Sequence, residues 1–248
     1  MWIRHFRPEP ESKVRLICFP HAGGAATYYH PFAGDLAPDV EVLAIQYPGR
    51  QDRYGEKRIE CIPELADAVF DALLPWCDRP FALFGHSMGA VVAFEVTRRL
   101  QHSDLSPLSL FLSGRRAPSR RPGGTVHLLG EADLIAELGR VGGTDPELLA
   151  DEDMRAVILP IARSDIKAAE TYVPVAGAKL DCPIWALVGD ADPETPIEDA
   201  SAWGDYTTSA FNLKVFPGGH FYLDPCRQDV LAAVSAALRQ PTEQAAAS

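Results

Sequence analysis

Residues 81–100 read FALFGHSMGAVVAFEVTRRL, and they give the strongest indication of the architecture. An apolar run of strand length leads into Gly85, and a run with helical spacing of apolar residues follows Gly89. Between them, Gly85-His86-Ser87-Met88-Gly89 has the G-x-S-x-G pattern of a nucleophile elbow. The glycines permit a tight turn in which the backbone passes close to itself. The stretch therefore predicts a strand, a sharp turn that projects the Ser87 hydroxyl at the carboxyl end of a sheet, and a helix.

Apolar runs of strand length and segments of helical period alternate on both sides of this stretch. The further predicted strands are 14–19, 40–46, 108–113, 184–189 and 213–216, each bounded by Pro, Gly or Asp. The further predicted amphipathic helices are 27–36, 62–76 and 228–238. This alternation is typical of the α/β class, with a mostly parallel central sheet and helices on both faces.

The segment of about 114–181 is too long for one crossover connection between two strands. It contains helical periods of its own near 131–140 and 147–171. We therefore expect an inserted helical lid. A chain of 248 residues can be built around one hydrophobic core, so residues 1–248 are expected to form a single domain that carries this insertion.

The charge balance excludes some partners. Twenty-three Lys and Arg against 34 Asp and Glu give a net charge of −11, which would repel a nucleic-acid backbone. No apolar run approaches the roughly 18 residues of a membrane span, and residues 1–10 lack the apolar stretch of a secretory signal. Neither nucleic acid nor membrane is an expected partner, and a cytoplasmic location is predicted.

The cysteines are scattered, and no two of them form a C-x-x-C pair; they are Cys18, Cys61, Cys77, Cys182 and Cys226. An odd number at such spacings indicates neither a disulfide framework nor a zinc site. Free thiols, mostly packed in the interior, are expected.

A serine hydroxyl needs a base to become a nucleophile, and the base needs a carboxylate to orient it. Of the seven histidines only His220 lies late in the chain, in a glycine-rich loop after the predicted strand 213–216. Loops at the carboxyl ends of parallel strands are the places from which such a sheet delivers catalytic side chains. His220 is therefore predicted to be the base for Ser87.

Three aspartates are candidates for the acid. Asp190 and Asp192 directly follow the predicted strand 184–189, and Asp224 is a more remote third candidate. Asp192 is favoured because the extra residues after the strand let its side chain reach over the sheet edge, whereas Asp190 is better placed to bond amides of its own turn. The sequence leaves open whether Asp190 could take the place of Asp192 as the acid. The chain order Ser87, Asp192, His220 is that of the α/β-hydrolase fold.

Acyl transfer through a tetrahedral intermediate requires two donors for the oxyanion. The backbone amide of Met88 follows the nucleophile, and the loop 19–25 after the first core strand contains glycines that let amides converge. The second donor is assigned to the amide of Ala22. The alternative interpretation of this loop is a glycine turn before a helix.

Six motifs, in their order and spacing, closely resemble those of the type II thioesterases of polyketide and nonribosomal peptide pathways. They are FPHAGG (19–24), YPGR (47–50), GHSMG (85–89), LSGRRAP (112–118), GDADP (189–193) and PGGHF (217–221). The resemblance covers nearly the whole chain. It implies hydrolysis of acyl groups from the phosphopantetheine arm of acyl or peptidyl carrier proteins, an editing role, and a lid over a gated acyl chamber. It also implies the same nucleophile, acid, base and oxyanion amides at the positions given above.

No metal, nucleotide or redox cofactor is expected, and a monomer is the simplest expectation. The four clustered arginines Arg115, Arg116, Arg120 and Arg121 are candidates to contact the phosphate of the carrier arm or acidic residues of the carrier. A solvated loop is the alternative for these arginines. The competing functions are a general carboxylesterase or small acyl-thioester hydrolase on the same fold, and a non-catalytic interaction protein.

Overall fold

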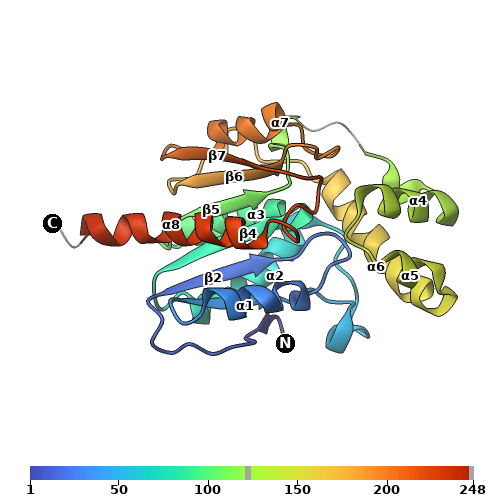
Figure 1. Ribbon diagram of the computed structural model, residues 1–248, viewed down its shortest axis with the longest axis horizontal. Coiled ribbons are helices and arrows are strands. Elements are labelled where there is room, and N and C mark those ends of the chain that lie inside the picture. Colours follow the sequence, from blue (N-terminus) through green and yellow to red (C-terminus); the bar gives the residue numbers. More distant parts are fainter. Residues whose placement is uncertain (121–123, 246–248) are drawn as a thin grey trace.

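The computed structural model of the protein describes residues 1–120 and 124–245, and it is built around one central sheet (Figure 1). Seven strands of the described chain form this sheet in the order β1-β3-β2-β4-β5-β6-β7. They are β1 (Ile3–Arg4), β2 (Val14–Phe19), β3 (Val40–Ile45), β4 (Phe81–His86), β5 (Leu110–Ser113), β6 (Ile184–Gly189) and β7 (Phe211–Phe216). Only β1 runs antiparallel to its neighbour, β3. The predicted class, a mostly parallel α/β sheet, is confirmed.

The edge strand β1 was not predicted. It has two residues, with Ile3 opposite Ile45 of β3. Two residues cannot display the alternation from which a strand is recognised in a sequence. By contrast, the inner strand β2 has the predicted bounds, because all six of its residues are buried and five of them are apolar.

Helices cover both faces of the sheet, as predicted. In Figure 1, α8 (Arg227–Ala245) and α1 (His30–Leu36) lie in front of the strands, and α2 (Ile62–Leu73) and α3 (Met88–Gln101) lie behind them. Alternate residues of β2 divide between the two layers: Leu16 packs with the α1 and α8 side, and Ile17 with the α2 and α3 side. A short helix, α7 (Ile197–Ser201), follows β6. No helix within 1–120 or 124–245 is long and apolar enough to cross a membrane.

Three α-helices lie in the described part of the long segment between β5 and β6. They are α4 (Glu131–Val141), α5 (Pro146–Ala150) and α6 (Glu152–Thr171). The sequence predicted one helical segment over 147–171, but it divides at Asp151, whose side chain accepts a hydrogen bond from the amide of Met154 (2.9 Å) and thereby starts α6.

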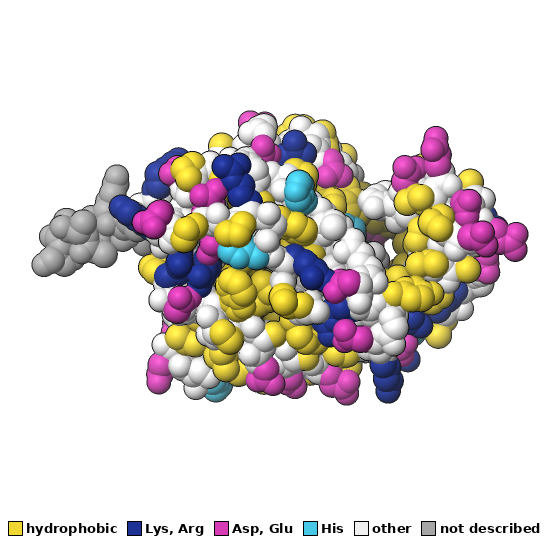
Figure 2. Space-filling model, turned by 90° about the horizontal axis from the view of Figure 1, so that it is seen from below, with side chains coloured by type: hydrophobic (Ala, Val, Ile, Leu, Met, Phe, Trp, Pro, Cys, Tyr) yellow, Lys and Arg dark blue, Asp and Glu magenta, His cyan; other side chains and the backbone are white. Residues whose placement is uncertain are grey.

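The insertion has a small apolar core of its own, in which Leu134, Leu149 and Leu159 are buried. It projects from the right of the molecule in Figure 2, which shows apolar side chains on its surface. Leu128 of the insertion is 71% exposed. The end of α6 returns to the main core, where Ala168 and Ala169 are buried. The insertion is therefore joined to the sheet mainly through its last helix.

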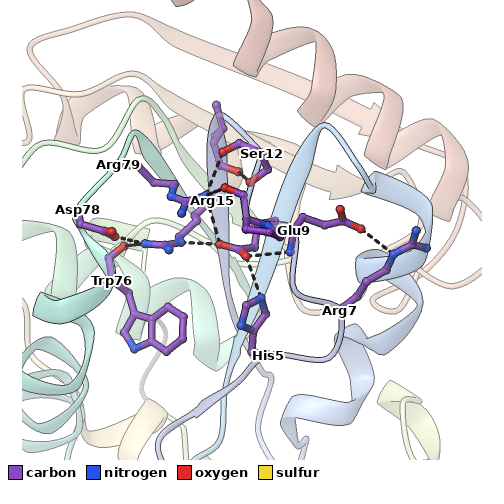
Figure 3. A network of polar contacts seen from close by, with 11 residues as sticks. His5, Arg7, Glu9, Ser12, Arg15, Trp76, Asp78 and Arg79 are labelled. Atoms are coloured by element: carbon purple, nitrogen blue, oxygen red, sulfur yellow. Dashed lines mark hydrogen bonds and ion pairs between the residues drawn. The ribbon is translucent and has the colours of Figure 1, made fainter.

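An ion-pair network closes the opposite, amino-terminal end of the sheet (Figure 3). Arg15 of β2 donates through Nε to Glu41 of β3 (2.6 Å) and through Nη1 to the carbonyl of Trp76 (2.8 Å). It also contacts the carboxylate of Asp78. Arg15 and Glu41 are both buried, so this end of the sheet holds a charged pair remote from the carboxyl ends of the strands.

Candidate active site

Ser87 lies in a strained turn between β4 and α3. Its backbone has φ 55° and ψ −117°, a conformation that L-residues adopt only where the surroundings enforce it. A Cβ at Gly85 would lie 2.2 Å from the carbonyl oxygen of Gly89, and a Cβ at Gly89 would lie 2.1 Å from that of Phe19. Both flanking positions therefore require glycine. The amide of Ser87 donates to the carbonyl of Ser113 (2.8 Å), which fixes the turn to β5.

His220 and Asp192 meet at the carboxyl edge of the sheet. His220 follows β7 and Asp192 follows β6, and Nδ1 of the ring lies 2.9 Å from Oδ2 and 3.1 Å from Oδ1 of the carboxylate. Both residues are buried, and Oδ1 also accepts the amide of Glu194 (2.8 Å). A carboxylate beside Nδ1 holds the proton on that nitrogen and leaves Nε2 free to act as a base.

The other candidate acids have different partners. Oδ1 of Asp190 accepts the amide of Gly218 (2.9 Å), in the loop that carries His220, and Oδ1 of Asp224 accepts the Tyr28 hydroxyl (3.0 Å). The sequence favoured a bond from Asp190 to its own turn, but the amide it binds belongs to the adjacent loop. Asp190 thus anchors the histidine loop, and Asp192 contacts the histidine.

Ser87 and His220 line the same cavity of about 300 Å³, together with His21, Ala22 and Met88. Within the described ranges no hydrogen bond joins the Ser87 hydroxyl to the His220 ring. Such bonds often form only when a substrate is bound. The amides of Ala22 and Met88 likewise have no hydrogen-bond acceptor in residues 1–120 and 124–245, so both are free to bind an oxyanion.

The remaining wall of the cavity comes largely from the insertion. Its apolar side chains are Val126, Leu138, Val141, Ile166 and Ala169. Charged groups also line the cavity, among them Arg115, Arg116 and Glu194. The volume is near the lower end of the range for small-ligand sites, and the mixed wall can enclose a short apolar chain next to a polar group.

The predicted arginine cluster is divided in the structure. Arg115 and Arg116 are half-buried in the cavity wall, where Nη2 of Arg115 donates to the carbonyl of Ala169 (3.4 Å) and Nε of Arg116 to that of Glu194 (2.9 Å). Arg120 is exposed, and Arg121 lies outside the described residues. The solvated-loop alternative therefore does not describe the first two arginines.

Two buried histidines beside His220 were given no functional role by the sequence. The ring centroid of His86 lies 5.1 Å from that of His220, and His21 lies 6.0 Å from His86 and 4.8 Å from Phe221. Burial lowers the pKa of His21 to about 3 and that of His86 well below its usual value. Both rings are therefore neutral and add no positive charge next to the base. The motifs FPHAGG and GHSMG contain His21 and His86, but nothing in their spacing predicts that these rings lie next to each other and next to His220.

Lowering the pH is expected to destabilise the fold through His21. Its pKa is about 3 in the folded protein and 6.5 ordinarily, so between these values the unfolded chain binds more protons and stability falls as the pH falls. From pH 7 to pH 5 this histidine alone costs about 2 kcal/mol of unfolding free energy. Urea unfolding of His21→Gln at both pH values should show a correspondingly smaller difference than wild type. His102→Gln changes a histidine at an exposed site and should keep the wild-type difference in unfolding free energy between the two pH values. A wild-type difference in His21→Gln would contradict the prediction.

The buried cysteines are unsuited to nucleophilic chemistry. All five cysteines are free thiols, as the sequence predicted. Burial raises the pKa of Cys182 to about 12 and that of Cys18 well above its usual value. In the ranges that the structure describes, no group of three or more His, Cys, Asp or Glu side chains could hold a metal ion.

Comparisons with known proteins relate the chain to thioesterases. A family model described as a thioesterase domain matches residues 14–238. The chain is 48% identical to the thioesterase PikA5 of Streptomyces venezuelae over 226 residues, which are 90% of this chain and 80% of that protein. It is similar to the solved structure of the type II thioesterase BorB from the borrelidin biosynthetic cluster, with 50% identity, a TM-score of 0.90 and coverage of 96% and 97% of the two chains. YbtT, a type II thioesterase from the yersiniabactin NRPS/PKS pathway, is 27% identical with a TM-score of 0.88 and coverage of 97% and 99%.

Proposed function

The chain belongs to the thioesterase family, and from this premise we propose that it is a serine thioesterase that frees the phosphopantetheine arm of acyl or peptidyl carrier proteins from unwanted acyl groups. Hydrolysis of thioesters in a polyketide or nonribosomal peptide pathway follows from the family and from its type II members. What we propose beyond the family is the role of each residue in the site and a carrier protein as the partner. The observation that carries it is that His220, which lines the same cavity as Ser87, has Nδ1 within 2.9 Å of Oδ2 of Asp192.

In the first half of the reaction, Nε2 of His220 takes the proton of the Ser87 hydroxyl while the oxygen attacks the thioester carbonyl. The carbonyl oxygen becomes an oxyanion, and the amides of Ala22 and Met88 donate hydrogen bonds to it. The intermediate collapses with breakage of the C–S bond. The imidazolium returns its proton to the departing thiolate, so the carrier leaves as a thiol and the acyl group remains on Ser87.

In the second half, water replaces the carrier thiol. His220 removes a proton from this water as its oxygen attacks the acyl-enzyme, and the same two amides bind the second oxyanion. Collapse releases the carboxylic acid and returns the proton to Ser87. Throughout, Asp192 holds the imidazole in the tautomer with the proton on Nδ1.

The insertion of about 114–181 is proposed to act as a lid within a single domain. Side chains of α4 and α6 form the apolar wall of the cavity that contains Ser87. A lid that closes over the acyl group excludes bulk water until the carrier thiol has left. The apolar core of Leu134, Leu149 and Leu159 supports movement of the lid helices as a unit.

Mass spectrometry of a loaded carrier protein tests the proposal. A carrier bearing acetyl, propionyl or longer acyl groups is incubated with the protein, and loss of the acyl mass is followed over time. We expect loss of the acyl mass at rates that depend on chain length. A carrier that stays loaded while a simple ester or a small acyl thioester is cleaved would support a general hydrolase instead, and the editing role would be wrong.

Neutralising Arg120 and Arg121 is expected to weaken recognition of the carrier and not of the acyl group. Arg120 is exposed and follows Arg115 and Arg116 of the cavity wall in the sequence, so its charge can attract an acidic carrier. Surface charge pairs contribute modestly to binding. The variant Arg120→Gln/Arg121→Gln should raise KM about five- to tenfold for an acyl carrier protein. KM for acyl N-acetylcysteamine should not change.

The matched control is Arg7→Gln/Lys13→Gln, which removes the same charge from exposed positions near the amino terminus. An equal rise of KM in this control would assign the effect to net charge. An unchanged KM in the arginine variant would remove these two residues from the docking surface.

A further inference from the structure

Arg50, the last residue of the YPGR motif, is buried against the loop that holds Ala22. Only 4% of Arg50 is exposed. Its Nη1 donates to the carbonyl of Gly24 (2.8 Å) and to Oδ2 of Asp165 (2.7 Å), and its Nη2 donates to Oδ1 of Asp165 (2.8 Å). The guanidinium thus bonds the loop and a carboxylate of α6 at the same time.

Asp165 completes a second link to the same loop. It is 2% exposed, and its Oδ2 accepts the amide of Gly23 (2.8 Å). This amide belongs to the peptide bond that directly follows Ala22. On the other side of Ala22, the hydroxyl of Tyr47 donates to the carbonyl of Pro20 (3.4 Å). The backbone on both sides of the proposed oxyanion amide is therefore held by groups outside the loop.

We propose that Arg50 and Asp165 are positioning residues of the reaction: their ion pair holds Gly23 and Gly24 so that the amide of Ala22 points at the developing oxyanion. This inference rests on the proposed function, since it assigns a cause to the geometry of the oxyanion site. It also links that site to the lid, because Asp165 lies on α6. Arg50 and Asp165 touch neither Ser87 nor His220 in the described contacts, so they act through the loop.

The loop needs such support for two physical reasons. Gly23 has φ +77°, and two successive glycines have more conformational freedom than any other pair of residues. An oxyanion site is effective only when its donors are fixed before charge develops. Stability alone is a weak explanation for the pair, because a buried ion pair can often be replaced by apolar residues of similar volume at little cost.

The test is the double variant Arg50→Met/Asp165→Leu, which removes the pair without leaving an unpaired buried charge. We expect kcat for an acyl N-acetylcysteamine thioester to fall about 10- to 100-fold, with KM within about threefold of wild type. Affinity for an acyl trifluoromethyl ketone should fall by a similar factor, because its adduct with Ser87 places an oxyanion in the same site.

Two readouts separate positioning from a general loss of structure. In a Ser87→Ala background, the Kd of the uncleaved thioester should be the same with and without the pair, since ground-state binding does not use the oxyanion. The midpoint of the pH dependence of kcat/KM should also stay the same, because the His220–Asp192 contact is unchanged.

The matched control is Arg15→Met/Glu41→Leu, which replaces the buried pair at the opposite end of the sheet (Figure 3). This control also replaces a buried ion pair by apolar residues, so its cost in stability should be comparable, while kcat should stay within about twofold of wild type.

Several outcomes would overturn the inference. A folded double variant with wild-type kcat would do so, as would an equal loss of kcat in the Arg15 and Glu41 control, or parallel losses of kcat and of thioester binding. If the double variant does not fold, Arg50→Lys replaces it, because lysine keeps the charge but cannot make the paired contacts. Wild-type kcat in Arg50→Lys would also overturn the inference. Failure of the proposed function is distinct, since the wild-type protein would then not hydrolyse the thioester at all.

Discussion

Replacing Ser87 with alanine is expected to lower kcat/KM for thioester hydrolysis by about 10⁴- to 10⁶-fold. The variant keeps the oxyanion amides and the base and can still bind the substrate, but it has no oxygen to form the acyl-enzyme. Stability should change little, because no hydrogen bond of the Ser87 hydroxyl occurs within residues 1–120 and 124–245. The measurement is the time course of acyl loss from a loaded carrier and from a small thioester.

A fluorophosphonate probe gives an independent readout of the same prediction. Wild type should gain one covalent adduct on the peptide that contains Ser87, and Ser87→Ala should gain none. Ser109→Ala, which removes a buried hydroxyl just before β5, is the matched control and should keep both labelling and turnover. Retention of more than about 1% of wild-type activity in Ser87→Ala would show that another group or a water molecule attacks the thioester, and the proposed mechanism would be wrong.

The fold was largely predictable because its inner strands are short, mostly apolar and mostly buried runs with clear ends. β2 and β6 have the predicted bounds, and Pro20 and Asp190 stop them. The exceptions depend on local chemistry or on length. The two-residue strand β1 exists only because β3 offers a free edge, and the break at Asp151 comes from a side-chain cap that a helical period does not record.

The candidate site was predictable where a residue lies in its own motif. Ser87, His220 and Asp192 each follow a strand, and parallel strands bring their carboxyl ends to one edge, so the cavity that Ser87 and His220 share follows from the topology. The groups that support the site were not predictable. Arg50 and Asp165 are 115 positions apart, and no local pattern indicates that a lid helix bonds an oxyanion loop.

Local sequence patterns also could not show which partners the two neighbouring aspartates, Asp190 and Asp192, bind. Sequence reasoning favoured Asp192 by its reach, and the structure gives each carboxylate a separate partner: His220 for Asp192, and the amide of Gly218 for Asp190. Two residues of the same type, two positions apart, are therefore expected to respond very differently to the same substitution.

Asp192→Asn is expected to lower kcat by about 10⁴-fold, close to the loss of a triad carboxylate in other serine hydrolases. The reason lies in the second bond of Asp192. Its Oδ1 accepts the amide of Glu194 (2.8 Å), so the oxygen of an asparagine will stay there and its NH₂ will take the place of Oδ2, 2.9 Å from Nδ1 of His220. A donor at that position requires an unprotonated Nδ1, which moves the proton to Nε2, where the base is needed.

The matched control is Asp190→Asn, whose amide oxygen can still accept the Gly218 amide, and kcat should remain within about fivefold of wild type. Both variants are measured with a small acyl thioester, so that recognition of a carrier does not enter, and urea unfolding verifies that both are folded. A loss in Asp190→Asn as large as that in Asp192→Asn would mean that the histidine loop, and not the tautomer, limits the reaction. Near-wild-type kcat in Asp192→Asn would mean that His220 is oriented without this carboxylate, and the acid would have to be sought elsewhere.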